Sequence, residues 1–165
     1  LFRSASRGVM NIDKSTFINN TAQVSGGAVS NENILNISDS TFTGNTANGV
    51  ANDIDNTGEL SLSGTNILEG GITGNTGITN VKSGTTSAKS LIQKVVNISD
   101  GAKLTVNNNL TTGTEENEGV VNNSQNGLEL QGGTLTGNIT GEGSTDITGN
   151  LAIASNSSIA QSMTF

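Results

Sequence analysis

Asp53 and Asp55 are the best candidates in the sequence for a catalytic or cation-binding pair of side chains. They flank Ile54, and alternate side chains of a β-strand point to the same face about 7 Å apart. Two carboxylates at that separation could act as acid and base in cutting a polysaccharide, or could ligate a cation. The hypothesis of a polysaccharide-active enzyme therefore depends on this pair.

The residues around the pair favour a protein that is not an enzyme. No Lys or Arg lies between Lys14 and Lys82, so no cation close in sequence could stabilise an anionic sugar intermediate. The chain also has no Trp and no Tyr, the aromatic side chains on which sugar-binding clefts usually stack their ligands. We therefore expect no catalytic residues.

Two glycine-rich segments are weaker signals of ligand binding. Gly26-Gly27 could begin a phosphate-binding loop, but no Lys follows and no strand-to-helix pattern surrounds it, so a turn is favoured. Residues 141–146 (Gly-Glu-Gly-Ser-Thr-Asp) are similar to an acidic calcium-binding loop. That segment occurs once, whereas calcium-binding repeats place their loops in a regular register. We predict no metal and no cofactor.

The overall composition excludes several mechanisms. The 165 residues include no His and no Cys, which removes imidazole bases, thiolate nucleophiles, disulfides and His-ligated zinc. With 14 acidic and 7 basic residues, the net charge of −7 repels phosphate backbones, so we expect no nucleic-acid partner. The apolar runs are far shorter than the roughly 20 residues that span a bilayer, so we expect no direct membrane insertion of this segment.

A repeat with a period of 25 residues is the most informative feature of the sequence. Residues 15–22 (Ser-Thr-Phe-Ile-Asn-Asn-Thr-Ala) reappear as residues 40–47 (Ser-Thr-Phe-Thr-Gly-Asn-Thr-Ala). The same offset aligns Val29 with Ile54, Asn31 with Asn56, Leu35 with Leu60, Ile37 with Leu62 and Ser38 with Ser63. A degenerate third copy aligns Phe42 with Ile67, and an apolar-Thr-Gly-Asn unit recurs at 42–45, 72–75, 135–138 and 147–150.

The repeat predicts an all-β fold. Apolar and polar residues alternate over short stretches such as 35–37 and 60–62, the pattern of strands with one buried face. Such short strands, separated by Gly, Asn, Asp and Ser, are too closely spaced for βαβ units and fit the coils of a parallel β-helix. A coil of about 25 residues gives about six to seven coils in a single segment over residues 1–165.

Residues 87–96 depart from the alternation. Their apolar residues fall at 88, 91, 92, 95 and 96, which is the spacing of an amphipathic helix. A short helix here would divide a first β segment (about 1–80) from a second (about 97–165). The alternative is two ordinary strands, which the β-branched pair Val95 and Val96 favours.

Two motifs of the repeat resemble a known family. Phe17-Ile18-Asn19-Asn20 and Phe42-Thr43-Gly44-Asn45 match a Phe-x-x-Asn motif, and Gly26-Gly27-Ala28-Val29 matches a Gly-Gly-Ala-apolar motif. The chain is similar, over roughly residues 11–65, to the polymorphic outer-membrane-protein repeats of autotransporter passengers. The resemblance implies a right-handed parallel β-helix displayed outside a bacterial cell, with the export signal and the membrane barrel in other parts of a longer protein. In the second copy Ala51-Asn52-Asp53 replaces Gly26-Gly27-Ala28, so this copy departs from the glycine motif.

The motif residues have a structural and a functional interpretation. Phe17 and Phe42 could contact a receptor, but a vertical core column continued by Ile67 is favoured. Asn20 and Asn45 could bind glycans, but corner turns or a ladder of stacked amides are favoured.

The repeat alignment also bears on the carboxylate pair. Asp53 and Asp55 align with Ala28 and Ser30, the positions on either side of the inward Val29 and Ile54. We therefore predict that both carboxylates lie on the solvated side of a coil.

The functional expectation is adhesion at a cell surface. A non-catalytic β-helix, displayed on the bacterial outer membrane or secreted, would attach to a host or bacterial cell-surface protein or glycan through many weak contacts. A self-assembling structural or spacer element is the first alternative, because Asn-rich coils with open strand edges can stack on one another. The polysaccharide-active enzyme is the second.

Overall fold

The computed structural model describes residues 2–4 and 8–165, and this part of the chain is all-β. Three parallel sheets, A, B and C, each contain eight of its strands. Sheet A consists of β1 (Phe2–Ser4), β5 (Val29–Asn31), β10 (Ile54–Asn56), β13 (Ile72–Thr73), β16 (Leu91–Ile92), β19 (Leu110–Thr111), β22 (Gly133–Thr136) and β25 (Leu151–Ile153). Sheet B consists of β2 (Val9–Asp13), β6 (Ile34–Ser38), β11 (Glu59–Ser63), β14 (Ile78–Val81), β17 (Val95–Ile98), β20 (Gly119–Asn122), β23 (Asn138–Thr140) and β26 (Ser158–Ile159). Sheet C consists of β3 (Thr16–Ile18), β7 (Thr41–Thr43), β12 (Thr65–Leu68), β15 (Thr85–Ala88), β18 (Lys103–Val106), β21 (Leu128–Leu130), β24 (Ser144–Ile147) and β27 (Ser162–Thr164).

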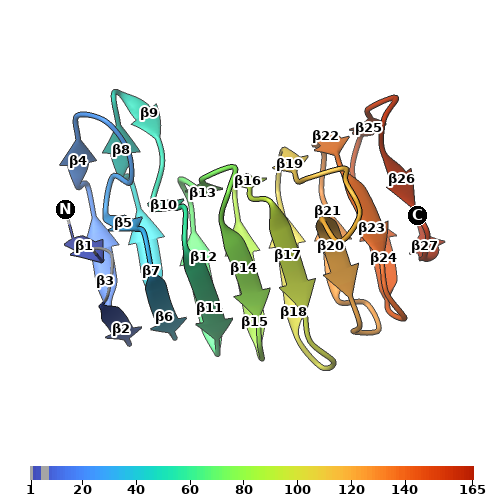
Figure 1. Cartoon of the computed structure of the whole chain (residues 1–165), viewed down its shortest axis with the longest axis horizontal. Helices are drawn as coiled ribbons and strands as arrows, with labels where there is room; N and C mark the ends of the chain where they lie inside the picture. The colour runs from blue at the N-terminus through green and yellow to red at the C-terminus, as the bar shows by residue number, and fades with distance from the viewer. Residues whose placement is uncertain (1, 5–7) are drawn as a thin grey trace.

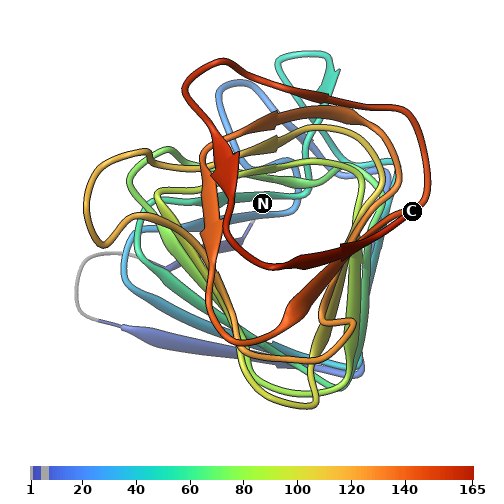
Figure 2. The same ribbon diagram turned by 90° about the vertical axis from the view of Figure 1, so that its right-hand side faces the viewer.

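The strands follow one another around the molecule in the order A, B, C. We call each circuit of the three sheets a coil and number the coils from the N-terminal end. Successive coils lie side by side along the long axis (Figure 1), and the view along that axis shows the sheets as three sides of a common interior (Figure 2). This stack of parallel strands is consistent with the predicted β-helix. Parallel pairing places equivalent residues of adjacent coils next to each other.

A fourth, small sheet lies outside this stack at the corner between sheets C and A. Sheet D consists of β4 (Thr21–Ala22), β8 (Thr46–Ala47) and β9 (Val50–Ala51). β4 and β8 pair in parallel, whereas β8 and β9 form an antiparallel hairpin. This sheet projects from the first coils at the upper left of Figure 1.

The interior of the coils is aliphatic and narrow. Leu35, Leu60 and Leu62 are fully buried, and the polar residues between them point outward, as the alternation predicts. Burial of each such side chain contributes about 1.5–3 kcal/mol. One aromatic pair adds to this core: Phe17 and Phe42 stack with ring centroids 4.7 Å apart and an angle of 3° between the rings.

The repeat register predicted for the first coils is confirmed. Val29 pairs with Ile54, and Asn31 with Asn56. The residues of sheet B that the 25-residue offset aligns also pair, Leu35 with Leu60, Ile37 with Leu62 and Ser38 with Ser63. The column of Phe17 and Phe42 is confirmed as well.

The predicted continuation of this register is wrong at Ile67. Leu68, rather than Ile67, pairs with Phe42, and Ile67 pairs with Thr41. A shift of one residue exchanges the two faces of a strand. Leu68 is therefore buried in the core, whereas Ile67 is 41% exposed on the outer face.

The predicted number of coils was too low. Asn31 and Asn56 are 25 residues apart, but Asp55 and its neighbour one coil later, Thr73, are only 18 apart. Shorter corners in the later coils therefore leave room for eight strands in each sheet over the described residues. The recurring apolar-Thr-Gly-Asn unit does not mark one place in the coil either, because Phe42 lies in sheet C and Ile72 in sheet A.

The helix considered for residues 87–96 does not form. This segment contains the end of β15, all of β16 and the start of β17. Ala88, Leu91 and Val96 are buried, because each lies on the inward face of a different short strand. The corners between these strands produce the helix-like spacing, and all three sheets continue across the segment.

A column of side-chain amides fills the corner between sheets A and B. Asn31 Nδ2 donates to Asn56 Oδ1 at 2.6 Å, and Asn56 Nδ2 donates to Gln93 Oε1 at 2.6 Å. All three side chains are buried. Buried amides are stable only when their donors and acceptors are paired, so this column satisfies polar groups that the aliphatic core could not.

Gln93 reaches across an intervening coil to complete the column. It belongs to coil five and Asn56 to coil three, while coil four contributes Gly74 and Gly77 at this corner. A Cβ on Gly77 would lie 2.7 Å from Gln93 Oε1 and 2.8 Å from Asn56 Nδ2. Coil four therefore requires glycine at this position, because a Cβ would overlap the Gln93 side chain.

The same arrangement recurs at the corner between sheets B and C. Asn122 Nδ2 donates to Gln161 Oε1 at 3.2 Å, and Gln161 Nε2 donates back to the Asn122 carbonyl at 2.7 Å. Gly141 and Gly143 occupy the coil between them, and their φ angles or close contacts leave no room for a side chain. In both cases a threonine of the middle coil, Thr79 or Thr145, donates to the glutamine oxygen at 3.0 Å.

Replacement of Gln93 tests whether this column stabilises the fold. Gln93→Met keeps the length and apolar stem of the side chain but leaves buried groups of Asn56 and Thr79 without a partner, so we expect a loss of about 3 kcal/mol in the free energy of unfolding. Chemical denaturation measures this loss. Gln125→Met, at an exposed position, should change the stability by less than about 0.5 kcal/mol, and an equal effect of both changes would contradict the role given to Gln93.

Candidate functional site

The site is built by a loop that the glycine pair makes possible. Residues 23–28, which we call the overhang, leave β4 and fold back to the start of β5. Gly26 has a left-handed φ of +60°, and a Cβ on Gly27 would lie 2.6 Å from Thr46 N. Gly27 N donates to Asn52 O at 3.1 Å, and Ala28 N donates to Asp53 O at 3.0 Å. The chain bends at this glycine pair, and the glycines allow the overhang to dock against the next coil.

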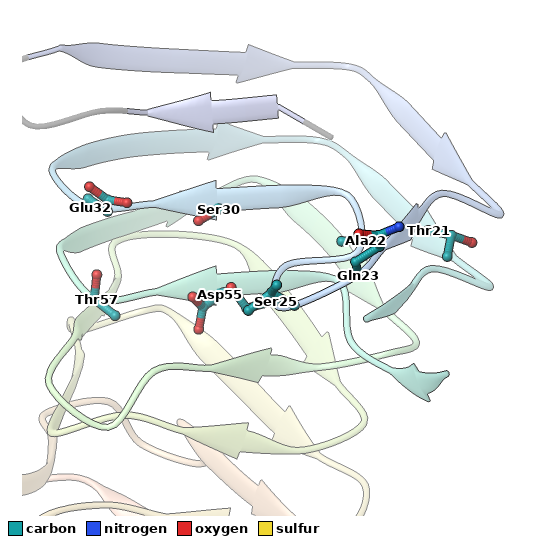
Figure 3. A pocket seen from close by; sticks show the side chains of 9 residues that line it. Thr21, Ala22, Gln23, Ser25, Ser30, Glu32, Asp55 and Thr57 are labelled. Atoms are coloured by element: carbon teal, nitrogen blue, oxygen red, sulfur yellow. The ribbon is translucent and has the colours of Figure 1, made fainter. Parts of the chain in front are cut away.

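A cleft of about 620 Å³, open to solvent, lies between the overhang and the outer face of sheet A. The strand face contributes Ser30 and Asp55, and the corner that follows it contributes Glu32 and Thr57. The wall formed by β4 and the overhang consists of Thr21, Ala22, Gln23, Val24 and Ser25. Figure 3 shows Ser30 and Asp55 on adjacent strands, with Ser25 of the overhang beside the strand that carries Asp55.

The two predicted carboxylates occupy different environments. Asp55 is half-buried on the outer face of β10, as predicted, and its Oδ1 accepts a hydrogen bond from Thr73 Oγ1 at 3.2 Å. Asp53 is fully buried, so the prediction that it lies on the solvated side of a coil is wrong. Asp53 precedes the strand at a corner, where the alternation of inward and outward side chains does not apply.

The Asp53 carboxylate accepts hydrogen bonds from two other parts of the chain, at Asn45 and at Gly70-Gly71. Its Oδ1 accepts a hydrogen bond from Asn45 Nδ2 at 2.9 Å, and its Oδ2 accepts hydrogen bonds from Gly70 N at 2.6 Å and Gly71 N at 3.1 Å. Burial raises the pKa of Asp53 from 3.8 to about 6, because the three N–H donors lower the pKa less than the loss of hydration raises it. Asp53 therefore has a structural position and does not face the cleft beside Asp55.

The asparagines of the Phe-x-x-Asn motif form the predicted ladder. Asn45 is buried, and its Oδ1 accepts hydrogen bonds from Asn20 N at 3.0 Å and from Asn20 Nδ2 at 2.9 Å. Asn45 Nδ2 also donates to Phe17 O at 3.1 Å. The motif thus supports the corner from which sheet D and the overhang project, and Asn20 and Asn45 do not line the cleft.

The cleft offers polar contacts to a ligand. Its lining combines hydroxyl groups, the Gln23 amide and carboxylates, with Val24 84% exposed at the rim. Such groups can exchange hydrogen bonds with the hydroxyls of a sugar or with the polar groups of a peptide. In residues 2–4 and 8–165, His, Cys, Asp and Glu do not gather into a group of three that could hold a metal ion.

Comparisons of the chain with protein-family models, with curated proteins and with solved structures find no match. Function therefore has to be inferred from the residues and their geometry. Across the same described ranges, no helix has the length and apolar character needed to cross a membrane.

The sequence motifs identify only part of this site. Asp55 and the glycine pair are recognisable in the sequence, but Thr21, Gln23 and Ser25 carry no pattern of their own. The difference between the two repeat copies is the signal that could have found them. Ala51-Asn52-Asp53 lacks the glycines of the first copy, and the second copy forms the β8–β9 hairpin in place of an overhang.

The pKa of Asp53 predicts a pH-dependent stability. Because this pKa is higher in the folded protein than the ordinary 3.8, the contribution of Asp53 to stability is complete below about pH 4 and is lost as the pH rises to about 6. Asp53→Asn removes this titration, so the fall in unfolding free energy between pH 4 and pH 7 should shrink by about 2–3 kcal/mol. Denaturant titrations at several pH values measure the slope.

Glu129→Gln is the comparison for this experiment. The Lys103 ammonium, 2.7 Å away, holds the pKa of Glu129 near 2, so the stabilisation from this ion pair is lost as the pH falls. Its removal should make the fall between pH 4 and pH 7 steeper. A flatter profile for Glu129→Gln, or an unchanged one for Asp53→Asn, would contradict the assignment.

Replacement of Gly27 tests the docking of the overhang. In Gly27→Ala the new methyl group would collide with the backbone of Thr46 and Asn52, so the hydrogen bond from Ala28 N should open more often. Hydrogen exchange of the Ala28 amide should become at least about tenfold faster, which corresponds to about 1.4 kcal/mol. Gly101→Ala, where no atom lies within 4 Å of the new methyl group, should leave this amide unchanged.

Proposed function

We propose that this chain is a non-catalytic segment of a surface-displayed autotransporter passenger, wound as a right-handed parallel β-helix. In this proposal it attaches, like an adhesin, to a host or bacterial cell-surface protein or glycan. Three features support this assignment: the stack of parallel coils, the Phe17–Phe42 column and the left-handed backbone of Gly26 in the glycine pair. They are the features in which the sequence resembles that family.

The cleft beneath the overhang is the observation that carries the binding role. It opens on the outer face of sheet A, and its lining displays hydroxyl, amide and carboxylate groups. Asp53, the second carboxylate that a polysaccharide-cutting mechanism would need, is held inside the coil by three N–H donors. Recognition of a polar ligand needs only the groups that face the cleft.

Asp55 provides the anchoring contact in this proposal. A half-buried carboxylate accepts strong hydrogen bonds from sugar hydroxyls or from the amide and ammonium groups of a protein. The cleft is open to solvent, which allows a chain to enter from the surface. The remaining outer faces then add weak contacts along the stack.

A binding experiment tests the proposal with a matched pair of variants. The purified chain should bind saturably to bacterial or host cells or to immobilised surface glycans. Asp55→Asn should weaken that binding about tenfold, the effect of losing one charged hydrogen bond. Asp146→Asn makes the same chemical change at a half-buried position on sheet C and should leave binding unchanged.

The other outcomes assign different roles. An equal loss in both variants would show that overall negative charge, rather than the cleft, causes the binding. Absence of binding to every surface would favour the passive spacer or self-assembling element. Release of products from an acidic polysaccharide, lost in Asp55→Asn, would favour the enzyme.

A further inference from the structure

Two Asn-Gly dipeptides occur in the sequence, Asn48-Gly49 and Asn126-Gly127. An Asn side chain is most easily attacked by the backbone nitrogen of the next residue when that residue is glycine, because no side chain obstructs the approach. The two dipeptides have the same intrinsic chemistry. Their surroundings in the folded protein differ.

Asn48-Gly49 forms the exposed turn of the β8–β9 hairpin. Both residues have left-handed backbones, with φ of 49° and 74°, as a two-residue hairpin turn requires. Both are exposed to solvent, and no atom lies within 4 Å of the position of a Cβ on Gly49. Among the described residues, neither the Gly49 N–H nor the Asn48 side chain has a hydrogen-bond partner. The strands on either side contain two residues each, so this turn is weakly restrained.

Asn126-Gly127 is restrained by hydrogen bonds and by the burial of its glycine, although Asn126 itself is exposed. Gly127 is buried, its N–H donates to Ser124 O at 3.0 Å, and a Cβ would lie 2.5 Å from the Ser124 side chain. The Asn126 side chain accepts a hydrogen bond from Ser144 Oγ at 3.2 Å, and Asn126 N donates to the same oxygen at 2.7 Å. The Gly127 nitrogen therefore cannot approach the side-chain carbon Cγ of Asn126 without breaking these hydrogen bonds.

We propose that Asn48 is a site of spontaneous deamidation in the folded protein and that Asn126 is protected from it. The Gly49 nitrogen bonds to Asn48 Cγ, and the side-chain nitrogen leaves as ammonia with the proton from the Gly49 amide. Solvent water then opens the resulting succinimide at either carbonyl. The products are aspartate or isoaspartate at position 48, each with one more negative charge than the asparagine.

Deamidation of Asn48 would affect the cleft, because backbone hydrogen bonds connect the hairpin to the cleft wall. Asn48 N donates to Ala22 O at 2.9 Å, and Ala22 is part of the cleft wall. Isoaspartate adds a methylene group to the main chain, so the two-residue turn and the pairing of Thr46 with Ala51 no longer fit. The neighbouring Asn52 accepts the hydrogen bond from Gly27 N that holds the overhang. Deamidation at position 48 is therefore expected to loosen the overhang.

Peptide mapping of the full-length chain tests the proposal. The folded protein is incubated at mildly alkaline pH, and samples are cleaved after glutamate, which places Asn48 in residues 33–59 and Asn126 in residues 119–129. Mass spectrometry with fragmentation then locates the residue at which an amide has become a carboxylate. Asn48 should react at least about fivefold faster than Asn126, the factor expected from one intact hydrogen bond at the protected site.

The same incubation in denaturant provides the matched control, because unfolding removes the structural difference between the two dipeptides. Asn48 and Asn126 should then react at similar rates. Equal rates in the folded protein, faster reaction at Asn126, or reaction in denaturant alone would overturn the proposal. In Asn48→Gln, where the ring that forms would be larger, the folded-state reaction at this position should disappear while reaction at Asn126 in denaturant persists.

Discussion

The fold depends on the pairing of buried side-chain amides between coils. An aliphatic interior cannot hydrate the Asn and Gln side chains at its corners, so these side chains need hydrogen-bond partners from other coils. Asn31, Asn56 and Gln93 meet this requirement at one corner, and Asn122 and Gln161 meet it at another. These columns fix the register of the sheets, because a slip of one residue would separate donors from acceptors.

The same requirement explains where the candidate site lies. Asn45 Nδ2 donates a hydrogen bond to Asp53 Oδ1 beneath the corner between sheets C and A. Sheet D and the overhang project from this corner. The glycine pair lets the chain leave the coil and return across the face of sheet A. Later coils turn this corner with fewer residues, and the cleft lies in the N-terminal part of the stack.

The sequence predicts the fold well where two copies of the repeat can be aligned without a gap. Val29 with Ile54 and Phe17 with Phe42 were predictable because corners of equal length keep the period at 25 residues, although the two corners differ in conformation. The predicted inward position of Ile67 was wrong, because one added residue before Leu68 exchanges inward and outward positions on this strand. The predicted exposure of Asp53 was wrong, because the strand begins at its neighbour Ile54. The alternation of inward and outward side chains does not extend to a corner residue. The cleft itself depends on a loop conformation that only the glycine pair suggests.

The glutamine that reaches across a coil has a consequence for how the stack comes apart. In repeat proteins each unit usually contacts its immediate neighbours, so the ends can fray one unit at a time. Gln93 and Gln161 instead join coils that are two apart, with a glycine-bearing coil threaded between them. Removal of the outermost of three such coils exposes polar atoms in the innermost, so we expect coils three to five and coils six to eight each to unfold as a unit.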